Sequence, residues 1–244
     1  MIMDVDFLEK MFEIVESRKE VGAVVPLIYR WDFLNKLKTS IIDSRGITIT
    51  PEHRFYEIDQ GRDSNDLKFA SEEVFGFSGA AVLFRLEALT DVAFLNKSGK
   101  NEYFDELMFM YKEDCDLSYR LQLAGWKIIT APQAKIYHDR TATGKGNSLW
   151  QIVFNRKNKS QQIKRWSFLH HWIILLKYKN LKFPWRVKIA TTWYQFKSLV
   201  FVVMVEPYLL SEFKKLWKIR NEIKDRRNAL KIKINIKEIF KIKS

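Results

Sequence analysis

Two adjacent carboxylates, Glu113 and Asp114, are the residues whose position in the sequence best suits acid–base chemistry. They belong to a run of five acids within residues 104–120. Behind them, apolar residues recur at helical spacing, at Leu117, Leu121 and Ala124. With Gly125 as a C-terminal stop, the pattern predicts a helix that starts near residues 112–114. Free N–H groups and the positive end of the dipole keep carboxylates in a first helical turn ionised. Asp114 could therefore accept a proton from a hydroxyl group, as a general base does.

Asp116 and Arg120 belong to the same predicted helix. Asp116 faces a different side from Asp114, and we expect it to orient a neighbour rather than to share the role of base. Arg120 follows four residues later, which is the spacing of a helical ion pair. Acids at a helix start are also common caps, so these residues alone leave a purely structural role open.

Gly79 and His138 are the two remaining candidates. Gly79 lies in an apolar stretch of small residues, 74–84, where glycine usually marks a close approach of the backbone to a neighbour or a ligand. His138 ends a predicted strand, and its neutral imidazole could bind a divalent cation. A single histidine at a strand end is more often solvated or structural than a ligand, and that alternative stays open.

The elements around these residues alternate between helix and strand. Apolar spacing after Asp6 predicts a helix with that aspartate as its N-cap. Residues 21–29 form an apolar, β-branched run that is typical of a buried strand. The polar residues 43–70 predict a long functional loop with short strands. Two further strands are expected at 126–130 and 134–138, separated by a proline, and this order favours an α/β layered domain.

Charge divides the chain into two regions. Residues 1–140 carry 18 Lys and Arg against 24 Asp and Glu, whereas residues 141–244 carry 24 against 5, so the second region supplies all of the net charge of +13. Its aromatic and aliphatic clusters alternate with Lys and Arg, a composition that suits the interface of an anionic membrane. No stretch reaches the roughly 18–20 uncharged residues that span a bilayer. The alternative is a set of ordinary core helices with a solvated basic rim. Residues 231–237 alternate with period two and predict a strand or an extended tail.

Three strings of the sequence resemble bacterial family-2 glycosyltransferases, particularly rhamnosyltransferase-like members: GFSGAAVLFR, FDELMFMYKEDCDLSYRLQLAGW and APQAKIYHDR. The resemblance runs over roughly residues 4–145. It implies a nucleotide-sugar-transferase (GT-A-like) fold that inverts the anomeric centre by direct displacement. Asp114, beside Glu113, matches the family's catalytic base. His138 matches a histidine that helps to hold Mg²⁺ or Mn²⁺ on the donor diphosphate, and the Gly79 stretch resembles the strand that lines the acceptor cleft.

The resemblance also implies that this chain is partial. Family members begin with a nucleotide-binding βαβ portion that ends in a metal motif, and this chain opens where that motif should end. Asp4-Val5-Asp6 spells Asp-x-Asp, but it falls at a helix start and is not expected to bind metal. We therefore expect an acceptor-side catalytic half over 1–144 and a basic, mainly helical, membrane-associating extension over 145–244. The donor nucleotide pocket is expected to be absent, and an upstream portion or a partner chain would supply it.

The leading hypothesis is an inverting glycosyltransferase that moves a sugar, rhamnose by family-level expectation, from a nucleotide-diphosphate donor to a lipid-linked or cell-surface polysaccharide acceptor. Asp116 and Arg120 would belong to its acceptor side. The alternative is an inactive fragment or subunit that binds membrane, acceptor lipid or a partner chain. A nucleic-acid partner is disfavoured, because the basic residues are interleaved with bulky aliphatic residues and no nucleic-acid motif appears. The single cysteine indicates a reducing compartment, and we expect a cytoplasmic protein, peripheral on the inner face of the plasma membrane.

Overall fold

A computed structural model describes residues 1–139 and 159–242. Within them, a five-stranded sheet runs in the order β1 (Ile2–Met3), β9 (Lys127–His138), β2 (Val21–Asp32) and β3 (Leu37–Ser44), with β6 (Leu83–Phe84) also paired to β2. The central strands β2 and β9 are parallel, and the other pairs are antiparallel. The α/β architecture expected from the sequence is therefore confirmed.

The strand β2 is the centre of this sheet because its first nine residues are all buried. A nearly continuous apolar run of this kind is typical of a strand that is covered on both faces. The two strands expected at 126–130 and 134–138 are instead one strand, β9. Its register against β2 shifts between Pro26 and Leu27, so the break expected at Pro132 is an irregularity within a single strand.

Three helices accompany the sheet in the first part of the chain: α1 (Phe7–Ser17), α2 (Leu86–Val92) and α3 (Glu113–Leu123). Asp6 occupies the N-cap position of α1 as expected, but its side chain makes no capping bond and pairs with Lys10 at 2.6 Å. Asp4 pairs with Lys38 at 2.9 Å. The polar loop after β3 contains the short strands expected of it, β4 (Ile47–Ile49) and β5 (Phe55–Glu57), and a 3-10 turn, η1 (Ser64–Asp66). Further along the chain, β7 (Phe94–Leu95) and β8 (Asn101–Glu102) form a second hairpin.

Every element assigned in residues 159–242 is helical. In chain order these are α5 (Gln161–Tyr178), α6 (Trp185–Val205), η2 (Pro207–Ser211), α7 (Glu212–Lys218), α8 (Arg220–Asn228) and α9 (Ile236–Ile239). Residues 231–235, part of the expected strand or tail, pair with no strand and lead into α9. None of the helices in the described residues is long and apolar enough to cross a membrane.

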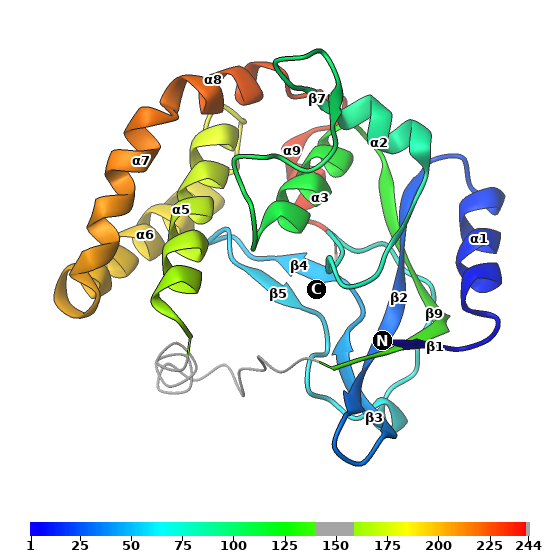
Figure 1. The fold of residues 1–244 in the computed structure, drawn as a ribbon. Coiled ribbons are helices and arrows are strands. Elements are labelled where there is room, and N and C mark those ends of the chain that lie inside the picture. The colour runs from blue at the N-terminus through cyan, green and yellow to red at the C-terminus, as the bar shows by residue number, and fades with distance from the viewer. Residues whose placement is uncertain (140–158, 243–244) are drawn as a thin grey trace.

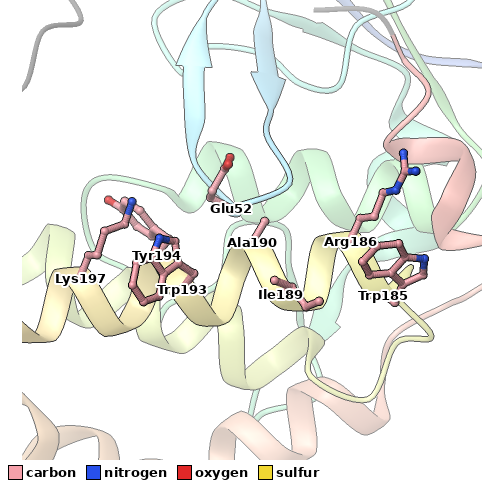
Figure 2. A pocket seen from close by; sticks show the side chains of 8 residues that line it. All are labelled: Glu52, Trp185, Arg186, Ile189, Ala190, Trp193, Tyr194 and Lys197. Carbon is pink, nitrogen blue, oxygen red and sulfur yellow. The ribbon is translucent and has the colours of Figure 1, made fainter.

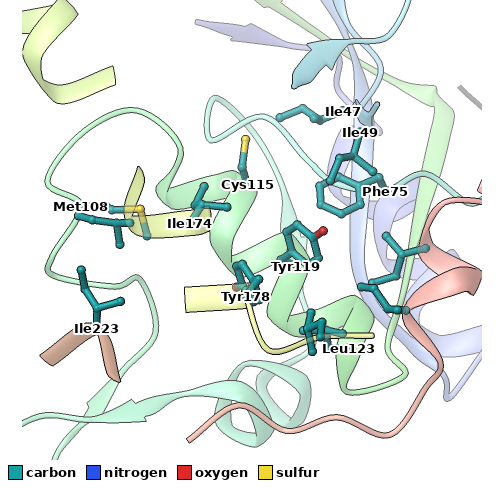
Figure 3. Packing of buried hydrophobic residues seen from close by; sticks show 14 of the residues in the cluster. Ile47, Ile49, Phe75, Met108, Cys115, Tyr119, Leu123, Ile174, Tyr178 and Ile223 are labelled. Atoms are coloured by element: carbon teal, nitrogen blue, oxygen red, sulfur yellow. The ribbon is translucent and has the colours of Figure 1, made fainter. Parts of the chain in front are cut away.

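Helix α3 lies between the sheet and these C-terminal helices (Figure 1). The largest apolar cluster joins both parts of the chain, because Phe75, Tyr119 and Leu123 pack with Ile174, Tyr178 and Ile223 (Figure 3). The rings of Tyr119 and Tyr178 stack with their centroids 4.2 Å apart.

The boundary expected between residues 144 and 145 lies outside the described residues. In those that are described, α5 packs as an ordinary core helix.

Candidate active site

Asp114 lies in the first turn of α3, where the sequence places it, and its side chain is partly exposed. Its carboxylate accepts two backbone hydrogen bonds, from the N–H of Gly79 at 3.1 Å and from the N–H of Cys115 at 2.7 Å. Two of the predicted site residues are thus brought together, although they are 35 positions apart in the sequence. Backbone donors of this kind stabilise the ionised carboxylate and fix its direction.

The residues just before Gly79 also pack closely against α3. The hydroxyl of Ser118 donates to the carbonyl of Asp114 at 2.7 Å and accepts from the N–H of Phe77 at 3.3 Å. A Cβ atom at Gly76 would lie 2.5 Å from that hydroxyl oxygen, so only glycine fits there. The apolar Gly-containing stretch therefore does mark a close backbone approach, and its neighbour is the helix that carries Asp114.

A strained turn leads directly into this pair of acids. Tyr111 and Lys112 have φ values of 67° and 73°, in the left-handed region that bulky residues rarely adopt. The imidazole of His170, on α5, holds the turn: its Nδ1 lies 2.9 Å from the Tyr111 carbonyl oxygen and must donate, because a carbonyl can only accept. Backbone strain of this kind tends to gather at functional sites. Neither residue type signals a left-handed turn, so sequence reasoning missed it.

Glu113 is half-buried beside Asp114, and its Oε2 has no hydrogen-bond partner among the described residues. Burial raises the pKa of this carboxyl, and the nearby charge of Asp114 raises it further. The two adjacent acids therefore have different surroundings. One has its carboxylate fixed by backbone donors, and the other has a carboxyl that is driven towards its protonated form.

Asp116 and Arg120 form the predicted ion pair, with Arg120 Nε 3.0 Å from Asp116 Oδ2. Both side chains are buried, and Asp116 also accepts hydrogen bonds from Lys177 Nζ at 2.7 Å and from the Tyr178 hydroxyl at 2.9 Å. Burial pushes the pKa of Asp116 upwards, but the charges of Lys177 and Arg120 outweigh it and lower the pKa. Enclosed in this way, Asp116 and Arg120 have no surface to offer an acceptor, and the expectation that Asp116 orients its neighbours fits the geometry better.

The ion pair extends into a buried network that the sequence did not reveal. Lys177 also bonds Asp105, whose other carboxylate oxygen lies 3.5 Å from Arg226 Nε. Arg226 in turn bonds both oxygens of Glu102, at 2.6 and 2.7 Å. The network ties α5 and α8 to the loop before α3. Its members are up to 124 positions apart, so no local spacing could have indicated them.

His138 ends β9 and contacts Asp43, which lies on β3. Its Nδ1 is 3.6 Å from Asp43 Oδ2 and has no hydrogen-bond partner among the described residues. No contact joins His138 to Glu113 or Asp114 in the described part of the chain. Nor do those residues hold any cluster of three or more His, Cys, Asp and Glu side chains that could bind a metal ion.

Comparison with known families supports the family-2 part of the resemblance. The model of the family described as glycosyl transferase family group 2 matches residues 2–213, which is most of the chain. No curated protein matches the sequence. The match includes α3, the Gly76–Gly79 segment and β9, and therefore all six of the residues singled out from the sequence. The chain belongs to glycosyl transferase family group 2.

Proposed function

We propose that the chain transfers a sugar from a nucleotide-diphosphate donor to an acceptor hydroxyl, with inversion of the anomeric centre and Asp114 as general base. One observation carries the proposal: the partly exposed Asp114 carboxylate is held by the N–H groups of Gly79 and Cys115 at the start of α3. A general base must be ionised, fixed in direction and open to its substrate. The two N–H donors fix the direction of the Asp114 carboxylate, and its partial exposure leaves it open to a substrate.

In the proposed reaction, Asp114 takes the proton of the acceptor hydroxyl while the hydroxyl oxygen attacks the anomeric carbon. The bond between that carbon and the diphosphate oxygen breaks on the opposite face, and the nucleoside diphosphate leaves with the electron pair. The two backbone N–H groups keep the carboxylate in one orientation through this step. Glu113, whose pKa is raised by burial and by the charge of Asp114, sits beside the base.

His138 and Asp43 would contact a divalent metal bound with the donor. The unpartnered Nδ1 of His138, next to a carboxylate, suits a Mg²⁺ or Mn²⁺ ion as two ligands, with diphosphate oxygens as the others. Such an ion would neutralise charge that develops on the leaving diphosphate. His138→Ala should then raise the Mn²⁺ concentration needed for donor binding in calorimetry. An unchanged metal requirement would remove His138 from this role.

The base assignment is tested by Asp114→Asn in a transfer assay with a nucleotide-sugar donor. Loss of general-base catalysis should lower kcat by roughly 10²–10⁴-fold, while donor binding stays nearly unchanged. Asp66→Asn, an exposed acid in η1, is the matched control and should leave kcat unaltered. Retained turnover in Asp114→Asn would defeat the assignment. A wild-type chain that binds membrane but transfers no sugar would favour the non-catalytic subunit, whose activity would need a partner chain.

The acceptor we propose is a lipid-linked or cell-surface polysaccharide reached from the inner face of the plasma membrane, with rhamnose as the first sugar to test. The support is electrostatic: the region after residue 140 has 24 Lys and Arg against 5 Asp and Glu. Such a region is attracted to the anionic cytoplasmic leaflet, where each cation near the surface contributes about 1 kcal/mol.

A further inference from the structure

Among the described residues, helix α6 packs on the rest of the protein along one side only. On that side Val187, Gln195 and Val202 are buried. The Thr191 hydroxyl donates to the Pro51 carbonyl at 2.9 Å, and Gln195 contacts His171 at 2.9 Å. These contacts set the rotation of the helix about its axis, so its opposite side faces away from the described part of the chain.

The outward side is a row of large apolar residues, here named the α6 stripe: Trp185, Ile189, Trp193, Phe196, Val200 and Val203. Their spacing of four, four, three, four and three positions follows a single helix face. Trp185 is 67 % exposed and Trp193 58 % exposed. Trp185, Ile189 and Trp193 also line a shallow pocket of about 370 Å³ that reaches Glu52 at the tip of the β4–β5 hairpin (Figure 2).

Cations flank the stripe, and α6 itself contains no Asp or Glu. Arg186, Lys188 and Lys197 are exposed on the helix, and Lys179 and Lys182 are exposed in the chain just before it. Arg186 lies 5.5 Å from the centre of the Trp185 ring, and Lys197 lies 5.7 Å from that of Trp193. None of the five cations forms an ion pair with another described residue. Lys197 interacts electrostatically with Glu52, so it is chiefly the charge of the other four that remains available to an anionic partner.

We infer that the α6 stripe is the surface by which the chain lies on an anionic bilayer, with the helix parallel to the membrane plane. Its aromatic and aliphatic side chains enter the interface, and its cations meet lipid phosphates. The inference rests on the membrane association within the proposed function and assigns that association to one surface. A second copy of the chain is the poorer occupant, because it would bring a second set of unpaired cations against the first.

The test is flotation with vesicles of phosphatidylcholine, with and without phosphatidylglycerol. The wild-type chain should bind only the anionic vesicles, and less as salt rises. Trp193→Glu/Phe196→Glu should lower binding at least tenfold, because each aromatic side chain that leaves the interface loses about that factor. Lys188→Glu/Lys197→Glu should lower it more than tenfold, since each cation contributes roughly fivefold.

Two control variants show whether vesicle binding depends on the α6 stripe and its cations or on any similar change elsewhere on the surface. Leu34→Glu changes another exposed apolar residue, at the β2–β3 hairpin, and Lys97→Glu/Lys100→Glu makes the same charge change in the β7–β8 turn. Binding in both should stay within twofold of the wild type, and all variants should keep the wild-type thermal midpoint. Asp114→Asn should bind vesicles normally, so a wrong catalytic assignment would not be mistaken for a wrong surface.

Three outcomes would overturn the inference. The first is a wild-type chain that binds neither kind of vesicle. The second is a stripe variant that binds as well as the wild type, which would place the contact elsewhere. The third is a wild-type dimer in light scattering that Trp193→Glu/Phe196→Glu converts to a monomer, since a second copy would then cover the stripe.

Discussion

Lys177 Nζ lies 2.7 Å from Asp116 Oδ1, and both side chains are fully buried. The pair joins α5 to α3 two residues beyond Asp114. Through His170, the same α5 also bonds the strained turn that precedes Glu113. The C-terminal helices are therefore part of the structure that positions the candidate base. Removing a contact of α5 should disturb the start of α3 even though no residue of α5 carries out the chemistry.

Replacing Lys177 with Met should lower the free energy of unfolding by about 3–5 kcal/mol, because Asp105 and Asp116 would both lose a fully buried cation, and only Arg226 and Arg120 would remain to balance them. Urea denaturation measures the change. Lys179→Met alters an exposed lysine two positions along the chain and should stay within about 0.5 kcal/mol of the wild type. Equal effects of the two substitutions would show that the buried network contributes nothing to stability.

The sequence predicted the parts of this site that depend on local pattern. Helical spacing and Gly125 give α3 with the correct start and end, since Gly125 adopts a φ of 85° as the terminating residue. The Asp116–Arg120 pair follows from its spacing of four. These features need only the propensities of neighbouring residues, so a single sequence is sufficient to find them.

Features that depend on tertiary contact were missed or misjudged. Period-two alternation after residue 230 suggested a strand or an extended tail, and the structure has no strand there: Lys231 and Lys233 extend to Asp91, and the backbone of Lys233 bonds the carbonyl of Leu123 at the end of α3. Alternation only separates two sides of an extended chain, and no strand among the described residues pairs with this segment. The placement of Lys177 beside Asp116, 61 positions away, is equally invisible to local pattern.

Gly76→Ala should destabilise the protein by about 1–3 kcal/mol, because the new Cβ would overlap the Ser118 hydroxyl oxygen at 2.5 Å and the Ser118 Cβ at 2.7 Å. Gly79→Ala is its control on the same segment. There the nearest atom, Asp114 Oδ2, would lie at an ordinary 3.7 Å, and the N–H that bonds Asp114 is retained. Thermal unfolding should separate the two variants, and a tolerated Gly76→Ala would refute the close approach.

Glu113→Gln should stabilise the protein at neutral pH. The pKa of Glu113 is raised in the folded chain, so the carboxyl favours folding below its unfolded pKa of about 4.5 and loses that contribution as the pH rises through the folded pKa. A neutral amide removes this dependence. Thermal midpoints of the two proteins should therefore coincide near pH 4 and separate above it, with the variant higher. A variant that is less stable at pH 7 would contradict the raised pKa.

Acid should lower the stability of the folded chain through His53. This residue lies in the turn of the β4–β5 hairpin, and its buried imidazole contacts α6. Thr191 donates its hydroxyl proton to Pro51, so His53 Nδ1 donates to Thr191 at 2.8 Å and Nε2 accepts from the Tyr119 hydroxyl at 3.2 Å. Desolvation lowers the pKa of His53 from 6.5 to about 4. Because the unfolded chain binds this proton first, stability should fall by up to roughly 3 kcal/mol between pH 6.5 and 4. His53→Gln should flatten that slope in urea denaturation across this range. An imidazole that titrates near 6.5 by NMR would show that the ring is not buried in this neutral form.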